Sequence, residues 1–121
     1  MSLLAERRIL LAEDEYFIMQ DLRSCLETLG VTVVGPVPSV AEALALIEAG
    51  AAVDAAVLDV NLRGEKVYPV ADALSSRGIP YVFSTGYSDG MLDPRYGQAP
   101  VCEKPVNMSE LGQTLATLLQ R

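Results

Sequence analysis

The sequence contains no histidine and no tryptophan, and it has only two cysteines, Cys25 and Cys102. The absence of histidine excludes serine-type triads, cysteine–histidine dyads and histidine general bases. The cysteines are far apart and lack a CxxC spacing, so a zinc site is not expected either. Both cysteines are interpreted as small hydrophobic core residues of a protein in a reducing compartment.

Basic residues are also scarce, because nine Lys and Arg stand against sixteen Asp and Glu and give a net charge of −7. Binding to a phosphate backbone needs clustered basic side chains, so nucleic acid is not expected as a direct partner. No apolar run approaches membrane-spanning length, and the N-terminus has no signal-peptide pattern. We therefore expect a cytoplasmic protein without a membrane-bound segment.

Half of the 121 residues are hydrophobic, which is enough to bury the core of one domain spanning residues 1–121. Short apolar runs alternate with helical patterns. Strands are expected at residues 9–12, 31–34, 55–58, 81–83 and 101–102. Helices are expected at about 16–29, 39–50, 69–78 and from 107 onward, the second and the last opening with capping boxes. This alternation predicts an α/β doubly wound domain with a parallel sheet.

The pattern has one gap, between the fourth and fifth expected strands. Residues 86–100 contain three glycines and two prolines, which interrupt any helical stripe. We predict a loop with at most one helical turn there. Its apolar residues Met91, Leu92 and Tyr96 either fold inward, which we favour, or mark a partner surface.

Polar residues follow the expected strands at the edge where open parallel sheets bind ligands. Glu13 and Asp14 follow the first strand, Asp59 the third, Thr85 the fourth and Lys104 the fifth. Three carboxylates brought together repel one another, and a hard divalent cation such as Mg²⁺ relieves that repulsion. A lysine and a hydroxyl beside them suit a phosphoryl group, so this edge predicts phosphoryl transfer to a carboxylate.

Four short segments carry a resemblance to a known family. They are ILLAEDE at 9–15, LDVNL at 58–62, STG at 84–86 and EKP at 103–105. In this order and spacing they resemble response regulator receiver domains over essentially the whole chain. The resemblance implies a five-stranded, flavodoxin-like sheet of order 2-1-3-4-5 and a phosphorylatable signalling domain. Such a domain is not a conventional enzyme, although it supports its own aspartyl phosphorylation and dephosphorylation.

The resemblance also assigns roles to residues of the expected site. Asp59 would be the phosphoacceptor, and Thr85 and Lys104 would bind the phosphoryl oxygens. The Lys104–Pro105 peptide would be cis. The backbone amides of Asn61 and Gly86 would complete the phosphoryl contacts.

The same resemblance implies a set of Mg²⁺ ligands. The set is Glu13, Asp14, Asp59 and the main-chain carbonyl of Asn61, with Glu13 acting mostly through water. From the residues alone, Glu13 and Asp14 also fit a solvated turn, and Glu15 fits a helix cap. Thr85 also fits a strand-end hydroxyl that bonds locally, and Lys104 an exposed loop charge.

Two departures from the common family pattern point to a subfamily. Val101 stands where most members carry an aromatic switch residue, and residues 86–100 replace the usual fourth helix. Together with the run Phe83-Ser84-Thr85-Gly86-Tyr87, these departures resemble a subfamily with a Phe-Ala-Thr-Gly-Tyr run. That resemblance implies an HWE-type histidine kinase, or a histidine phosphotransfer protein, as the phosphodonor. Our hypothesis is that the loop at 87–100 and the fifth strand change state to signal; Tyr87 either lines the site entrance or covers the loop.

Three alternative functions compete with this interpretation. A haloacid-dehalogenase-like phosphatase would need a second Asp at position 61, where this chain has Asn61. A flavin-binding flavodoxin would need a phosphate loop after the first strand, where this chain has acidic residues. A receiver-like domain that has lost phosphorylation and only binds proteins is a third. We expect the phosphorylated domain to act in one of three ways. It binds a downstream protein partner, it serves as a phosphate sink for a kinase, or it regulates a longer protein of which this chain is a part.

Overall fold

A computed structural model describes residues 3–86 and 90–120 of the chain. The main strands are β1 (Arg8–Ala12), β2 (Thr32–Val37), β3 (Ala55–Asp59), β6 (Tyr81–Thr85) and β7 (Val101–Glu103). The helices are α1 (Tyr16–Thr28), α2 (Val40–Glu48), α3 (Tyr68–Ser75) and α4 (Met108–Leu119). Two further short strands, β4 (Asn61–Leu62) and β5 (Glu65–Lys66), and a 3-10 turn, η2 (Pro94–Tyr96), complete the elements.

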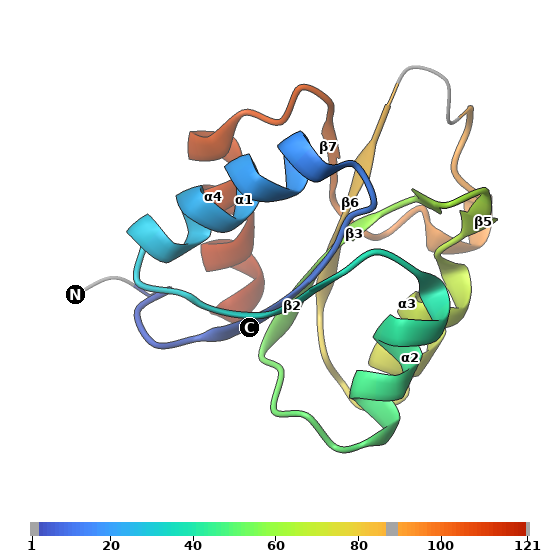
Figure 1. Cartoon of the computed structure of the whole chain (residues 1–121), viewed down its shortest axis with the longest axis horizontal. Helices are drawn as coiled ribbons and strands as arrows, with labels where there is room; N and C mark the ends of the chain where they lie inside the picture. Colours follow the sequence, from blue (N-terminus) through green and yellow to red (C-terminus); the bar gives the residue numbers. More distant parts are fainter. Residues whose placement is uncertain (1–2, 87–89, 121) are drawn as a thin grey trace.

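The five main strands form one parallel sheet in the order β2-β1-β3-β6-β7. This is the predicted doubly wound order, because β6 and β7 are the fourth and fifth strands of the sheet. Helices α1 and α4 cover one face, and α2 and α3 cover the other (Figure 1). All five residues of the central strand β3 are buried, as expected for a strand covered on both faces.

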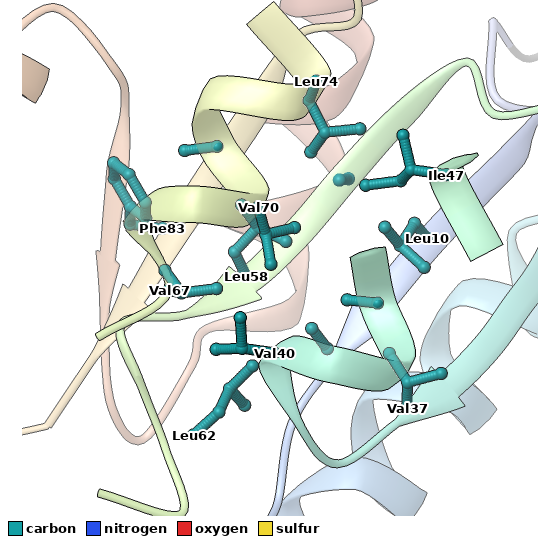
Figure 2. Packing of buried hydrophobic residues seen from close by; sticks show 14 of the residues in the cluster. Leu10, Val37, Val40, Ile47, Leu58, Leu62, Val67, Val70, Leu74 and Phe83 are labelled. Atoms are coloured by element: carbon teal, nitrogen blue, oxygen red, sulfur yellow. The ribbon is translucent and has the colours of Figure 1, made fainter. Parts of the chain in front are cut away.

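Each face of the sheet has its own hydrophobic core. Leu10, Leu58 and Phe83 point toward α2 and α3, where Ile47 and Leu74 pack against them (Figure 2). Their neighbours in the strands point to the other face and pack against α1 and α4. Because successive side chains of a strand alternate between faces, these apolar runs supply both cores at once.

Helices α1, α2 and α4 begin where their capping residues predict. Ser39 Oγ accepts a hydrogen bond from the Glu42 backbone N–H at 3.2 Å, and Asn107 Oδ1 accepts one from Glu110 N at 2.9 Å. Glu15 Oε2 accepts from Ile18 N at 2.8 Å, so this carboxylate caps α1. These side chains pair backbone donors that the first turn of a helix leaves without partners.

The second strand is longer than predicted, because β2 continues through Gly35 and Pro36 to Val37. We expected Gly35-Pro36 to end it. A proline cannot donate a hydrogen bond to a neighbouring strand, but β2 is an edge strand with a neighbour on one side only. The register with β1 shifts between Leu10 and Ala12, and this irregularity accommodates the Gly-Pro pair.

The predicted loop in place of the fourth helix is confirmed for residues 90–100, where η2 is the single helical turn among the described residues. Tyr96 is buried and stacks on Tyr68 with ring centroids 4.5 Å apart. The Tyr96 hydroxyl donates to Asp72 Oδ1 at 2.6 Å, and Asp93 N donates to the Tyr68 hydroxyl at 2.9 Å. The loop is thus fastened to α3, with Tyr96 turned inward and Met91 exposed.

A small antiparallel hairpin of β4 and β5 was not predicted. It pairs Asn61 with Lys66 and Leu62 with Glu65, and it lies between β3 and α3. The two-residue turn Arg63-Gly64 joins its strands.

None of the helices within 3–86 and 90–120 has the length and apolarity needed to span a membrane.

Candidate functional site

Acidic residues meet at the carboxyl edge of the sheet. Glu13 and Asp14 follow β1, and Asp59 is the last residue of β3, the strand next to β1. The three carboxylates each place an oxygen within 4.8 Å of the others. Glu13 and Asp59 are buried, with 1% and 3% of their surface exposed, whereas Asp14 is exposed. The predicted cluster is therefore present, with two of its members inside the protein.

Lys104 is the cation that faces this cluster. Its Nζ lies 2.9 Å from Asp59 Oδ2 and 3.2 Å from Glu13 Oε1, and its side chain is 17% exposed. Lys104 follows β7, and its backbone N–H donates to the carbonyl of Thr85 at 2.8 Å, which ties the ends of β6 and β7 together. The Lys104–Pro105 peptide is cis, as predicted.

Each carboxylate also accepts one backbone hydrogen bond. Asp59 Oδ1 accepts from Asn61 N at 3.1 Å, and Glu13 Oε2 accepts from Glu15 N at 3.0 Å. Asp14 Oδ2 accepts from Arg63 N at 2.9 Å. These bonds fix one oxygen of each group and leave the other for Lys104 or for a ligand.

Burial shapes the ionisation of this cluster. Burial, together with the nearby Asp59 carboxylate, raises the pKa of Glu13 to about 7. Burial also raises the pKa of Asp59, although Lys104 opposes that rise. For Lys104, burial lowers the pKa, but the two carboxylates outweigh it and the net shift is upward. The lysine is therefore held as a cation beside carboxyl groups that a further positive charge would help to ionise.

The donor set fits a hard divalent cation. It consists of carboxylate oxygens, and the buried Glu13 Oε1 has an ion-pair contact with Lys104 but no hydrogen-bond partner. Hard cations with few protein ligands prefer such oxygens, and they keep several waters. Glu13, Asp14 and Asp59 could therefore hold an ion such as Mg²⁺.

Comparison with known proteins shows the family. SdrG from Sphingomonas melonis Fr1 is 51% identical, with a TM-score of 0.84 over 98% of this chain and 99% of that one. The BeF3-activated conformation of SdrG gives 49% identity and a TM-score of 0.78 over 95% and 98% of the two chains. A response regulator receiver protein from Sinorhizobium medicae WSM419 is 26% identical, with a TM-score of 0.83 over 95% of each chain. The chain belongs to the response regulator receiver family. No protein-family model and no curated protein sequence matches it.

As a receiver domain, the chain is a signalling domain of two-component systems, and the phosphatase and flavin-binding alternatives are set aside. The structure brings together Glu13, Asp14, Asp59 and Lys104 from the predicted set. Thr85 ends β6 and pairs in register with Glu103 of β7, which places it at the same edge of the sheet.

Three further predicted positions lie shortly after β3, directly after β6 and at the start of β7. The Asn61 N–H donates to Asp59, and Gly86 directly follows β6. Val101, which stands where most receiver domains carry an aromatic switch residue, is 37% exposed. Tyr87 and its neighbours 88 and 89 lie outside the described residues, and both interpretations of Tyr87 stay predictions.

Sequence reasoning missed the role of the segment after Asp59. Arg63 contributes its backbone N–H to Asp14 although the two residues are 49 positions apart. No motif marks a backbone donor, because every residue except proline has one. The glycine at position 64 was the only local signal of a turn there.

Proposed function

We propose that this receiver domain takes a phosphoryl group from a phosphohistidine onto Asp59 in a Mg²⁺-dependent reaction. The observation that carries the proposal is the buried Asp59 carboxylate with Lys104 Nζ at 2.9 Å inside a cluster of three carboxylates. A buried carboxylate at a strand end, beside a cation and further acidic groups, has the makings of a nucleophile for phosphoryl transfer.

The cation would be held by Glu13, Asp14, Asp59 and the main-chain carbonyl of Asn61, with Glu13 acting mostly through water. When bound, Mg²⁺ screens the repulsion between a carboxylate nucleophile and an anionic phosphoryl group. Burial raises the pKa values of Glu13 and Asp59, and a positive charge close to both carboxyl groups would favour their ionised forms.

In the transfer step, an oxygen of Asp59 forms a bond to phosphorus while the phosphorus–nitrogen bond of the donor histidine breaks. The electron pair of that bond returns to the imidazole nitrogen, and the product is an aspartyl phosphate. Lys104 pairs with a phosphoryl oxygen, and the Thr85 hydroxyl binds another. The backbone amides of Asn61 and Gly86 provide the remaining hydrogen bonds. Attack of water on phosphorus later releases phosphate, so the same residues support dephosphorylation.

Intact-mass analysis tests the phosphoacceptor. The protein is incubated with a small acyl phosphate and Mg²⁺, and we expect one phosphoryl adduct. Asp59→Asn should reduce the adduct to background, because the amide is not a nucleophile, and so should removal of the metal with a chelator. Asp54→Asn, directly before β3 and therefore at the opposite end of that strand from Asp59, is the matched control and should leave the adduct unchanged.

Absence of an adduct from acyl phosphates and from a panel of phosphorylated histidine kinases would contradict the proposal. The domain would then act as a binding module that has lost phosphorylation. An adduct that persists in Asp59→Asn would place the acceptor elsewhere. Inclusion of HWE-type kinases and histidine phosphotransfer proteins in the panel identifies the donor class.

We further propose that the loop at 87–100 and the fifth strand, β7, transmit the signal to a partner, or that the domain serves as a phosphate sink. Two hydrogen bonds already fasten residues 93–96 to α3. Tyr96 donates to Asp72, and the Asp93 N–H donates to the Tyr68 hydroxyl. Ordering on phosphorylation should therefore concentrate in the part of the loop before Asp93.

Hydrogen–deuterium exchange with and without beryllofluoride tests this loop hypothesis. We expect exchange of the amides between Gly90 and Asp93 to slow when the phosphoryl mimic is bound, because the loop becomes ordered. The amides of α2 serve as the internal control, because the hydrogen bonds that fasten the loop are made to α3 and not to α2. Unchanged exchange throughout residues 90–100 and β7 would show that the signal leaves by another route.

A further inference from the structure

Asp14 differs from the other carboxylates of the site in how it is held. Glu13 and Asp59 are buried and contact Lys104, so packing and ion pairs restrict their orientation. Asp14 is exposed, and the hydrogen bond from Arg63 N to its Oδ2, at 2.9 Å, fixes its carboxylate. An exposed carboxylate without such a bond would sample several rotamers, which costs conformational entropy when it must bind a ligand.

The donor N–H lies in a turn whose geometry depends on one glycine. The β4–β5 hairpin closes through Arg63 and Gly64, with φ values of 52° and 85°. A two-residue hairpin turn with positive φ at both central positions has the type I′ arrangement, which favours Asn or Gly. Gly64 N also donates to Asn61 Oδ1 at 2.9 Å, which links the turn to the residue that contacts Asp59.

We propose that the Arg63-Gly64 turn is a positioning device that orients Asp14 for the cation. The turn occupies one carboxylate oxygen and leaves the other available to the metal. The proposal rests on the proposed function, in that it presupposes a divalent cation at this site. Groups that orient metal ligands in this way typically change metal affinity about 10–100-fold when they are removed.

Gly64→Val tests the proposal. Valine is β-branched and strained at a φ of 85°, so the turn should change shape and withdraw the Arg63 N–H from Asp14. A Cβ at position 64 would meet no atom within 4 Å, so steric clashes with the rest of the protein should be small. We expect calorimetric titration of the full chain with magnesium chloride to show affinity at least about 10-fold weaker than that of the unmodified protein.

Two variants separate positioning from general strain. Gly50→Val makes the same change at a glycine with φ of 83° and with no atom within 4 Å of the added Cβ. It lies after α2, away from the acidic cluster, and should leave magnesium affinity unchanged. Gly64→Asn should keep most of the magnesium affinity of the unmodified protein, because asparagine tolerates positive φ.

The outcomes distinguish failure of this proposal from failure of the metal site itself. If the unmodified protein does not bind magnesium, the proposed metal site fails. If it does bind, equal affinity in Gly64→Val overturns the positioning role, and so does an equal loss in Gly50→Val. If Gly64→Val folds poorly, the exchange rate of the Arg63 amide is compared between Asp14→Ala and the unmodified protein. Faster exchange supports the pairing, and unchanged exchange overturns it.

Discussion

Replacing Lys104 by methionine is expected to lower the free energy of unfolding of the metal-free protein by about 3 kcal/mol. The change removes the cation that lies 2.9 Å from Asp59 and 3.2 Å from Glu13, while both carboxylates remain buried. Removing one partner of a buried ion pair leaves the other charge uncompensated, and this is more costly than the pair itself is stabilising. Urea unfolding in the presence of a chelator measures the loss.

The chain offers a matched control and a rescue for this prediction. Arg23→Met on α1 removes a cation whose ion pair with Glu27, at 3.7 Å, is exposed, and it should alter stability by less than about 0.5 kcal/mol. Adding Asp59→Asn to Lys104→Met should recover part of the loss, because one of the two buried negative charges is then neutral. If Lys104→Met unfolds at the same urea concentration as the unmodified protein, the ion pairs do not stabilise the fold.

Truncation of Phe83 to alanine is expected to cost about 3–5 kcal/mol, the range for deleting a buried phenylalanine. Its ring is fully buried and makes edge-on contacts with Tyr68, Tyr81 and Tyr96. Because Tyr96 holds the loop at 90–100 against α3, the cavity should also loosen that loop. Urea unfolding and faster amide exchange at Tyr96 would report the two effects.

Phe17, the other phenylalanine in the sequence, is the control. It is 74% exposed on α1, so Phe17→Ala makes the same chemical change with little loss of buried area. A comparable loss of stability in both variants would show that the contacts of Phe83 are not the cause. Loss of stability in Phe83→Ala without faster exchange at Tyr96 would mean that the stacking and hydrogen bonds between the loop and α3 hold the loop without help from Phe83.

Much of the fold and the site could be predicted because the relevant signals are local. Apolar runs that end in Glu13, Asp59 or Lys104 specify both a buried strand and a polar group at its carboxyl end. In a parallel sheet these ends meet at one edge, so strand order and chemistry follow together. The capping residues Ser39 and Asn107 likewise place the starts of their helices within a few positions.

The features that escaped prediction depend on distant partners. Whether β2 could continue through Pro36 depended on its place at the sheet edge, which only the complete topology decides. The contact between Arg63 and Asp14 uses a backbone donor that has no sequence signature. The inward turn of Tyr96, by contrast, is the interpretation that the sequence favoured, although its partners Tyr68 and Asp72 on α3 could not be named from the sequence.

The edges of the sheet bear on how the domain avoids aggregation. Pro36 removes a hydrogen-bond donor from the edge strand β2, and the opposite edge strand, β7, is only three residues long. Short or proline-containing edges are poor templates for adding a strand from another chain. Copies of the domain present at high local concentration should therefore resist joining edge to edge into amyloid-like ribbons.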